Sequence, residues 1–477
     1  MVELGGWKNS GTLRHCSETV FRNPTSRNRR TSCQPRSRVA WPLGLLKFVS
    51  ARELRGLSNE VRVRQGQQSL DWEGMAGAHI LGIESSCDET AAAVVWAGEK
   101  IVSNVVASQI ATHQPYGGVV PELASREHLR AIVPVVRQAL ADAGQVYQSI
   151  DAIAVTQGPG LAGALLVGIS YAKALAFALE KPLIAVNHLE GHIHAVLLEE
   201  RQKHNRVMKF PVLALVVSGG HTHLYLASER AEIWTYENIG HTRDDAAGEA
   251  FDKVAKLLGL GYPGGPVIDL LSAHGDPGAI KFSPSQIKHA DRKTSSGLSR
   301  RMQKEKTPKD GASAVRNRDS SPERDRFDFS YSGIKTAVLR HVETHDLRGA
   351  IEARRRGLAA ILKPELEDYL AHCDRQTLDL VASFQRAMVE DLVGKTLAAA
   401  RASGAATLFV TGGVAANNEL RSRFEQSAAE AGLPVYFPSR RLSTDNAAMI
   451  AAAAYPKFLA KDFAATDFSA EAGMALR

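Results

Sequence analysis

The stretch IDAIAVTQGPGLAGALLVGISYAKALAFAL, residues 150–179, joins three local patterns in one run. An apolar segment of strand length comes first, a Gly158-Pro159-Gly160 turn follows, and a longer apolar segment of helix length completes the run. Strand, glycine turn and helix in this order are typical of a parallel sheet covered by helices. The stretch therefore predicts an α/β fold.

The segments on either side extend this layer. Short β-rich runs precede it and predict a meander, while a strand that leads directly into a helix follows it. The elements expected here are strands at residues 79–84, 91–96, 101–107 and 182–187, and helices at about 121–141 and 188–200.

A second half opens in the same way, with two β runs around a Gly219-Gly220 turn within residues 212–227. Its other expected elements are helices at about 246–258, 266–274, 334–342, 376–403 and 444–458, and strands at 407–414 and 434–438. Two halves of this kind predict duplicated lobes around a central cleft, where ligands bind near strand ends and helix starts. We expect a first lobe at 75–210, completed by about 447–477, and a second lobe at 211–446.

Two basic segments fall outside this pattern. Residues 1–74 hold 13 Lys and Arg against 6 Asp and Glu, and residues 285–326 hold 12 against 6, whereas the whole chain carries only +7. We expect 1–74 to be a disordered basic leader or a mis-set start before Met75, with a mitochondrial transit peptide as the alternative. We expect 285–326 to be a flexible insertion, because it has too little apolar surface to fold.

The sequence indicates neither a membrane protein nor a protein stabilised by disulfides. No stretch approaches the roughly 20 apolar residues that a membrane-spanning helix needs, so no membrane partner is expected. The four cysteines have no CxxC spacing, which indicates neither a disulfide scaffold nor a thiolate zinc site.

His188 and His192 stand four residues apart at the start of an expected helix. Their imidazoles share one face, with about 5–6 Å between Cβ atoms, which suits two ligands of one metal. An isolated pair of this spacing also fits a helix cap beside a core or surface histidine. Glu190, two residues after His188, faces away from the pair, and the HExxH motif of zinc proteases is absent.

Several glycine turns follow or lie between strands, and glycine also serves ordinary tight turns. Helices starting just beyond them offer N–H groups to an anion such as a phosphate, which favours a nucleotide in the cleft. The turns are Gly158-Pro159-Gly160, Ser218-Gly219-Gly220, Gly264-Gly265 and Gly412-Gly413. Asp252, Asp269, Asp445 and Asn417 lie within or near them; each alone fits a helix cap or a solvated turn.

Seven motifs span most of residues 78–460 in one order: GIESSCDETAAAVV (82–95), NHLEGHIHA (187–195), VVSGGHTHL (216–224), DDAAGEAFDKVAKLLGLGYPGGP (244–266), FSYSGIKTAV (329–338), TGGVAANNELR (411–421) and STDNAAM (443–449). As a set they resemble the tRNA N6-adenosine threonylcarbamoyltransferase family, whose older label is O-sialoglycoprotein endopeptidase. The basic segments at 1–74 and 285–326 are not part of the family pattern. The resemblance implies the actin-like, or sugar-kinase, fold with two duplicated lobes.

The resemblance also implies a set of site residues. One divalent metal, usually assigned as iron, is held by His188, His192 and Asp445. Two histidines and a carboxylate with open positions suit Fe(II), and zinc is chemically credible. The substrate-binding residues implied are Val216, Val217, Ser218, Gly219, Gly220, Asp252, Gly265, Asp269 and Asn417.

The implied reaction takes threonylcarbamoyl-adenylate and tRNA to N6-threonylcarbamoyladenosine and AMP. The target is adenosine 37, in the anticodon loop of tRNAs that read codons beginning with adenine. No Ser or Cys nucleophile is required, because the acyl group arrives activated on a phosphate. The resemblance implies two partners, a paralogous actin-like subunit and a small P-loop ATPase, and a cytoplasmic location.

Three competing interpretations remain. A metalloprotease needs a glutamate directly after the first histidine, and residue 189 is Leu. A kinase or ATPase of the actin-like class shares the fold, but its first turn usually reads Asp-x-Gly rather than Glu84-Ser85-Ser86. A non-catalytic scaffold would have lost metal ligands, and none is lost here.

Overall fold

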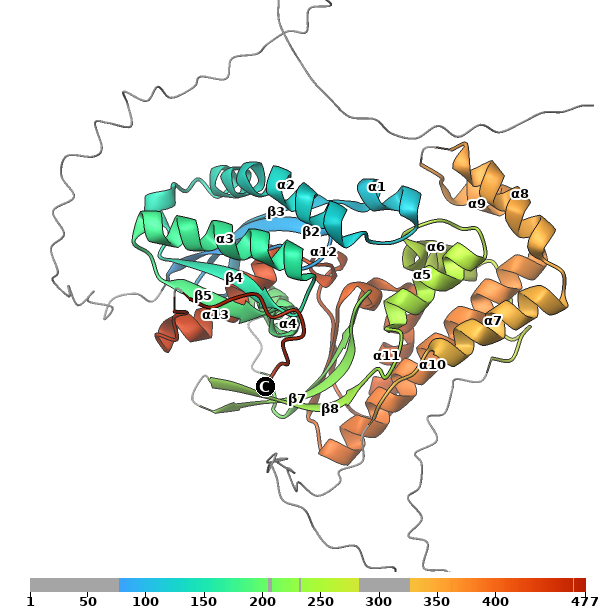
Figure 1. Cartoon of the computed structure of the whole chain (residues 1–477). Helices are drawn as coiled ribbons and strands as arrows, with labels where there is room; N and C mark the ends of the chain where they lie inside the picture. The colour runs from blue at the N-terminus through green and yellow to red at the C-terminus, as the bar shows by residue number, and fades with distance from the viewer. Residues whose placement is uncertain (1–76, 205–207, 231–232, 283–326, 362, 466) are drawn as a thin grey trace, which may run out of the picture. The chain divides into compact units, whose positions relative to one another are not determined.

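The computed structural model describes residues 77–204, 208–230, 233–282, 327–361, 363–465 and 467–477 (Figure 1). They belong to one compact unit, Trp72–Arg477. The leader expected at 1–74 and the insertion expected at 285–326 lie outside the described residues.

The first sheet is built as the opening stretch predicts. Its order is β3-β2-β1-β4-β5, with an antiparallel meander followed by two parallel strands. The strands are β1 (His79–Glu84), β2 (Glu89–Trp96), β3 (Lys100–Ser108), β4 (Ala152–Gly158) and β5 (Leu183–Asn187).

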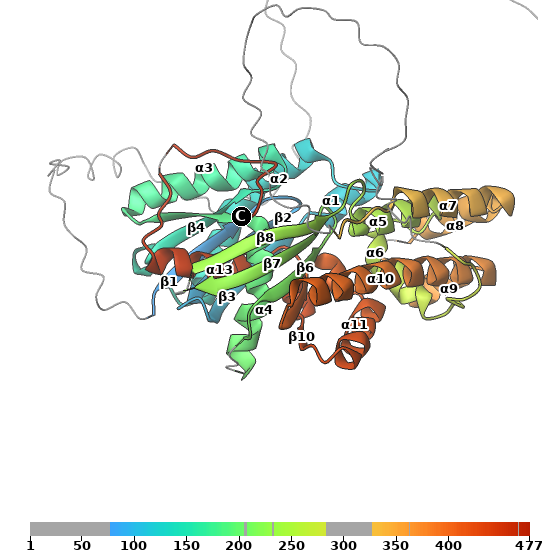
Figure 2. The ribbon, with the colours of Figure 1, turned by 90° about the horizontal axis from the view of Figure 1, so that it is seen from below.

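Helices cover both faces of this sheet (Figures 1 and 2). α2 (Pro121–Asp142) and α3 (Ala162–Leu179) pack on one face, and α13 (Ala447–Leu459) packs on the other. Small residues allow α13 to approach closely: a Cβ on Gly82 of β1 would lie 2.3 Å from the carbonyl oxygen of Ala447. The short helices between β3 and β4 are α1 (Ile110–His113), η2 (Gln114–Tyr116) and η3 (Tyr147–Ser149).

The second sheet repeats the first. Its order, read from the edge of the meander, is β8-β7-β6-β9-β10, the same succession of antiparallel and parallel pairs. The strands are β6 (Val212–Val217), β7 (Thr222–Arg230), β8 (Ile233–His241), β9 (Thr407–Thr411) and β10 (Val435–Tyr436). The duplicated, actin-like α/β fold is therefore confirmed.

The helices of the second half are more numerous than the sequence patterns predict. The core between them is apolar, and Phe251 of α5 meets Phe384 of α10 edge to face, with ring centroids 5.3 Å apart. The elements are α5 (Ala247–Leu257), α6 (Gly264–Ser272), α7 (Ser332–Thr344), α8 (Arg348–Ala359), α9 (Leu366–His372), α10 (Arg375–Ser403), η4 (Gly413–Ala416), α11 (Asn418–Glu430) and α12 (Arg440–Ser443).

One helix start differs from its prediction in a way that matters for the site. The last helix is expected from residue 444, but α13 begins at Ala447. Asn446 is its N-cap and accepts a hydrogen bond from the Met449 N–H at 3.1 Å. Asp445 therefore lies in a bend just ahead of the helix.

α3 corrects the expectation that no segment is apolar enough to cross a membrane. It has 18 residues with a mean hydropathy of 1.7, which passes that test by length and composition. Its small and branched residues, including Ala164, Leu165 and Ile169, are buried against the first sheet. α3 thus packs one face on the sheet, while Leu166 and Phe177 remain exposed on its outer side.

Candidate metal centre and adjoining turns

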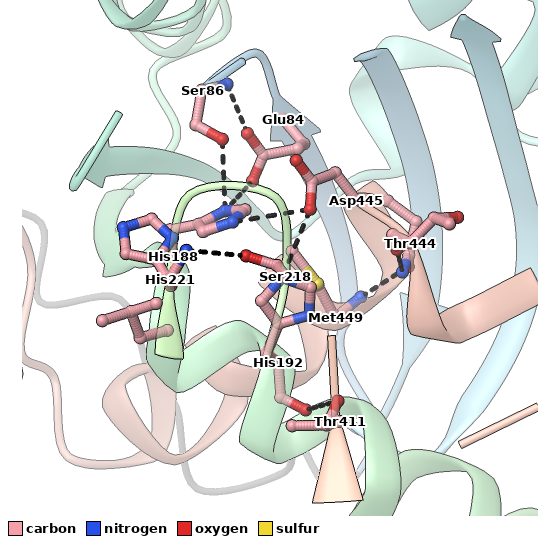
Figure 3. Close-up of polar contacts among 12 residues, drawn as sticks. Glu84, Ser86, His188, His192, Ser218, His221, Thr411, Thr444, Asp445 and Met449 are labelled. Atoms are coloured by element: carbon pink, nitrogen blue, oxygen red, sulfur yellow. Dashed lines mark hydrogen bonds and ion pairs between the residues drawn. The ribbon is translucent and has the colours of Figure 1, made fainter. Parts of the chain in front are cut away.

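Three candidate metal ligands meet where the first lobe faces the β6–β7 turn (Figure 3). β5 ends at Asn187 and α4 (His188–His204) begins at the next residue, so His188 and His192 project from the first turns of that helix. Asp445 reaches them from the segment before α13. The ligand atoms of all three lie within 4.8 Å of one another.

The geometry of this cluster suits a cation. Asp445 Oδ1 lies 3.5 Å from His188 Nε2 and 3.2 Å from His192 Nε2. The second contact lacks hydrogen-bond geometry, so neither ring nitrogen of His192 has a hydrogen-bond partner among the described residues. A buried imidazole without a hydrogen bond is costly, and a metal between His192 Nε2 and Asp445 Oδ1 would satisfy this nitrogen. Two histidines and one carboxylate fit such an ion.

The electrostatics agree with this arrangement. Burial opposes charge on His188, but the carboxylates of Asp445 and Glu84 outweigh it and raise the pKa of this imidazole to about 9. Burial likewise opposes charge on Asp445, yet the histidines hold the pKa of its carboxyl well below the usual range. The raised pKa of His188 marks a place that favours positive charge, and the lowered pKa of Asp445 keeps its carboxylate ionised. A metal would supply that positive charge when it displaces the proton.

Glu190 does not belong to this cluster, as the helical geometry predicts. Its carboxylate lies 3.6 Å from Lys457 Nζ and accepts a hydrogen bond from the Tyr236 hydroxyl at 3.5 Å. Leu189, the residue that would be the glutamate of a zinc protease, is buried in the core. The arrangement therefore lacks the general base of that class.

The turn between β6 and β7 lies beside the cluster. The ring of His221, which ends this turn, is 6.0 Å from that of His188. No atom lies within 4 Å of the position that a Cβ would take on Gly219 or Gly220, so a ligand can approach the backbone here. The side chains of Val216 and Val217 are fully buried, so only their main chain is available to a ligand.

The remaining predicted binding residues continue along α5, α6 and α11. Gly248 N–H donates to the Ser218 carbonyl at 3.1 Å, which fixes the turn against α5. On the same helix, Asp252 accepts from the Gly264 N–H at 2.7 Å and so caps α6. Burial raises the pKa of Asp252. Gly265, next along, has open space around its Cα.

Asp269 and Asn417 meet through one glutamine. Gln385 Nε2 donates to Asp269 at 3.4 Å, and Asn417 Nδ2 donates to Gln385 Oε1 at 2.7 Å. Asn417 also caps α11, accepting from the Leu420 N–H at 2.9 Å. The structure thus brings these two residues together, and helix capping accounts for part of Asn417's contacts.

Sequence reasoning gave no role to Glu84 and Ser86, which contact His188, or to Thr156, which contacts Glu84. Glu84 Oε2 lies 3.0 Å from His188 Nδ1 and accepts from the Thr156 hydroxyl at 2.7 Å. Ser86 Oγ lies 3.2 Å from the same ring nitrogen. The only sign of this role in the sequence is that Glu84 is an acidic residue at the end of the apolar strand HILGIE.

Comparisons with known proteins agree with these motifs. The model of the family described as tRNA N6-adenosine threonylcarbamoyltransferase matches residues 100–452. A protein of that name from Koribacter versatilis is 68% identical over 403 residues, covering 84% of this chain and 100% of the relative. Another from Syntrophobacter fumaroxidans is 48% identical over 376 residues, covering 79% and 93%. With a match across most of its length, this chain belongs to the tRNA N6-adenosine threonylcarbamoyltransferase family.

Proposed function

We propose that this chain transfers the threonylcarbamoyl group from threonylcarbamoyl-adenylate to N6 of adenosine 37 in tRNAs that read codons beginning with adenine. The observation that carries the proposal is an intact His188, His192 and Asp445 cluster in a chain 68% identical, over the relative's whole length, to a protein of that name. The N6 amine attacks the carbamoyl carbon and loses a proton. The bond from that carbon to the phosphate oxygen breaks, and AMP leaves.

The chain's own part in this reaction is binding and orientation. The amine is a weak nucleophile, so the rate depends on holding it against the activated carbonyl. We assign the adenylate to the backbone of residues 216–220 and to Asp252, Gly265, Asp269 and Asn417. The open space at Gly219, Gly220 and Gly265 supports close approach by a phosphate or ribose. Asp252 and Asp269 offer carboxylates to ribose hydroxyls.

His188, His192 and Asp445 would hold one divalent metal, and we propose Fe(II), with zinc as the alternative. When bound, such an ion supplies Lewis-acid stabilisation of the charge that develops on the carbonyl and phosphate oxygens. Elemental analysis of full-length protein purified without oxygen tests its identity. Iron in proportion to protein supports the proposal, whereas zinc alone contradicts the choice of metal.

A kinase of the same fold is disfavoured by the state of Glu84. In that class the acidic residue of the first turn must face the phosphates. Here the Glu84 side chain is fully buried and its oxygens accept from Ser86 N–H, Thr156 and His188. The Glu84 carboxylate is therefore not available to face the phosphates of a nucleotide.

The full-length chain is expected to restore threonylcarbamoyladenosine to the tRNA of cells that lack their own enzyme. The measurement is mass spectrometry of tRNA nucleosides, with the partner proteins from the same genome supplied alongside. In parallel, the purified chain is incubated with ATP and small hydroxyl acceptors. Unmodified tRNA despite soluble protein, together with phosphate transfer from ATP, would reverse the assignment in favour of the kinase.

The proposal includes the two partners, a paralogous actin-like subunit and a small P-loop ATPase, and a cytoplasmic location. Cell fractionation of the full-length chain tests the location, and recovery with mitochondria would contradict it. For the paralogous subunit, the outer side of α2 and α3 offers an apolar groove of about 500 Å³. Leu129 is 65% exposed and Leu166 is 50% exposed there, and exposed apolar side chains of this kind support its use as an interaction surface.

Leu166→Asp is expected to abolish co-purification of the paralogous subunit, because it places a charge in this apolar groove. The matched control is Leu459→Asp, on the opposite face of the same lobe, where the leucine is 46% exposed. Pull-down from cells producing both subunits measures the effect, and thermal unfolding of each variant checks the fold. Equal recovery of the subunit with both variants would place its binding site elsewhere.

A further inference from the structure

Glu84 is a fully buried carboxylate at the end of β1. Burying such a group costs several kcal/mol unless its oxygens are fully hydrogen-bonded. Both oxygens are engaged here. Oε1 accepts from the Ser86 N–H at 2.5 Å, and Oε2 accepts from the Thr156 hydroxyl at 2.7 Å. The carboxylate is therefore held in one orientation by the two ends of adjacent strands β1 and β4.

The same oxygen Oε2 lies 3.0 Å from His188 Nδ1 (Figure 3). Because a carboxylate only accepts, the ring must donate, which places the proton of the neutral imidazole on Nδ1. The lone pair is then on Nε2, the nitrogen that faces Asp445 Oδ1 at 3.5 Å. The Glu84 contact thus fixes the tautomer, and together with Ser86 Oγ, 3.2 Å from the same nitrogen, it fixes the direction of the ring.

His192 has no equivalent support. Its Nδ1 lacks a hydrogen-bond partner among the described residues, and the Thr411 hydroxyl donates to its main-chain carbonyl, at 2.9 Å, rather than to the ring. The ring of His192 is therefore held by packing in α4, whereas that of His188 is held by a charged acceptor. Glu84 therefore supports only one of the two histidines, His188.

We propose that Glu84 is a positioning residue that orients His188 as a metal ligand. The inference rests on the metal site of the proposed function and adds a residue that does not itself touch the metal. Histidine ligands in metalloproteins generally donate their second ring N–H to such an acceptor, and loss of it lowers metal affinity about 10–100-fold. Glu84, at the end of strand β1, thereby holds a metal ligand in position without contacting the metal.

Glu84→Gln tests this role at nearly constant volume. An amide offers one acceptor, so it cannot serve both the Ser86 N–H and the pair of donors at Oε2. Glu84→Asp is the second variant, which keeps the charge but is one methylene too short to reach Nδ1. The matched control is Glu190→Gln, a second buried carboxylate on the first turn of α4, which contacts Tyr236 and Lys457 instead.

Zinc affinity is measured on the full-length chain by competition with a chromophoric chelator, and the Co²⁺ absorption spectrum is recorded at saturation. Both Glu84 variants are expected to bind zinc about 10–100-fold more weakly than the parent. They should also shift the cobalt spectrum, which loss of stability alone would not do. Glu190→Gln should change neither.

Two results would overturn the inference, and they differ. Parent-like zinc affinity and cobalt spectrum in both Glu84 variants would show that His188 needs no such support, while leaving the metal site intact. Failure of the parent chain itself to bind zinc or cobalt would remove the proposed metal site and the role of Glu84 with it.

Discussion

The His192→Ala variant is expected to lose both its metal and its transferase activity. His192 supplies one of three ligands, and its buried ring nitrogens have no hydrogen-bond partner among the described residues. Removing the ring leaves two ligands, too few to hold the ion. A bound metal stabilises the charge that develops in the transition state by several kcal/mol. Without it, transferase activity should fall about a hundredfold or more.

The matched control is His194→Gln, on the same helix. His194 is also buried, but it contacts the Tyr236 hydroxyl at 3.1 Å, and its ring lies 5.0 Å from that of Trp234 at a tilt of 52°. Elemental analysis and threonylcarbamoyladenosine formation are measured for both variants. His194→Gln should keep its metal and its activity. A metal-loaded, fully active His192→Ala protein would refute the assigned ligand set.

Gly412→Ala is expected to destabilise the protein by about 3 kcal/mol or more, through backbone strain and a rigid clash. Gly412 has φ +94°, a conformation that side-chain-bearing residues rarely adopt. A Cβ there would lie 2.3 Å from the Val217 carbonyl oxygen, which belongs to strand β6 and cannot move without its sheet. The strain would reach the adjoining Ser218-Gly219-Gly220 turn, so adenylate binding should weaken as well.

The neighbouring Gly413→Ala is the control for this prediction. Gly413 has no heavy atom within 4 Å of its Cβ position and no positive φ, so alanine should be tolerated. Chemical denaturation gives the free energy of unfolding of each variant. Similar stability of the two would mean that β6 and β9 are not as closely apposed as the structure has them.

Much of the fold could be predicted because its signals are local. The meander strands and the glycine turn of residues 150–179 lie in runs whose pattern repeats in the second half. Strand β8 (Ile233–His241) was missed, since Glu237 and Asn238 interrupt its apolar character at the edge of the sheet. Helices α8 and α9 were missed too; the sequence of α8 is rich in arginine and its few buried positions give a weak pattern.

The residues of the candidate site also differ in how far the sequence indicates them. The spacing of His188 and His192 suits a ligand pair but fits a helix cap beside a core histidine as well, so the family resemblance was needed to choose between them. Asp445 is far away in sequence and could be joined to them only through the family resemblance. Glu84 could not be assigned at all, because its role depends on a tertiary contact with a helix 104 positions later. Burial of a charged group is a property of the folded chain, not of its local sequence.

The return of α13 to the first sheet has a consequence for biosynthesis. A ribosome releases β1 to β5 long before it has translated Ala447–Leu459, the helix that covers one face of their sheet. Until then that face is left without its cover, and Asp445 has not yet joined the two histidines. The nascent first lobe therefore exposes apolar surface that the finished chain buries, and such surface favours aggregation. The three candidate ligands come together only after translation has passed residue 445, so the proposed metal would be loaded once most of the chain has been made.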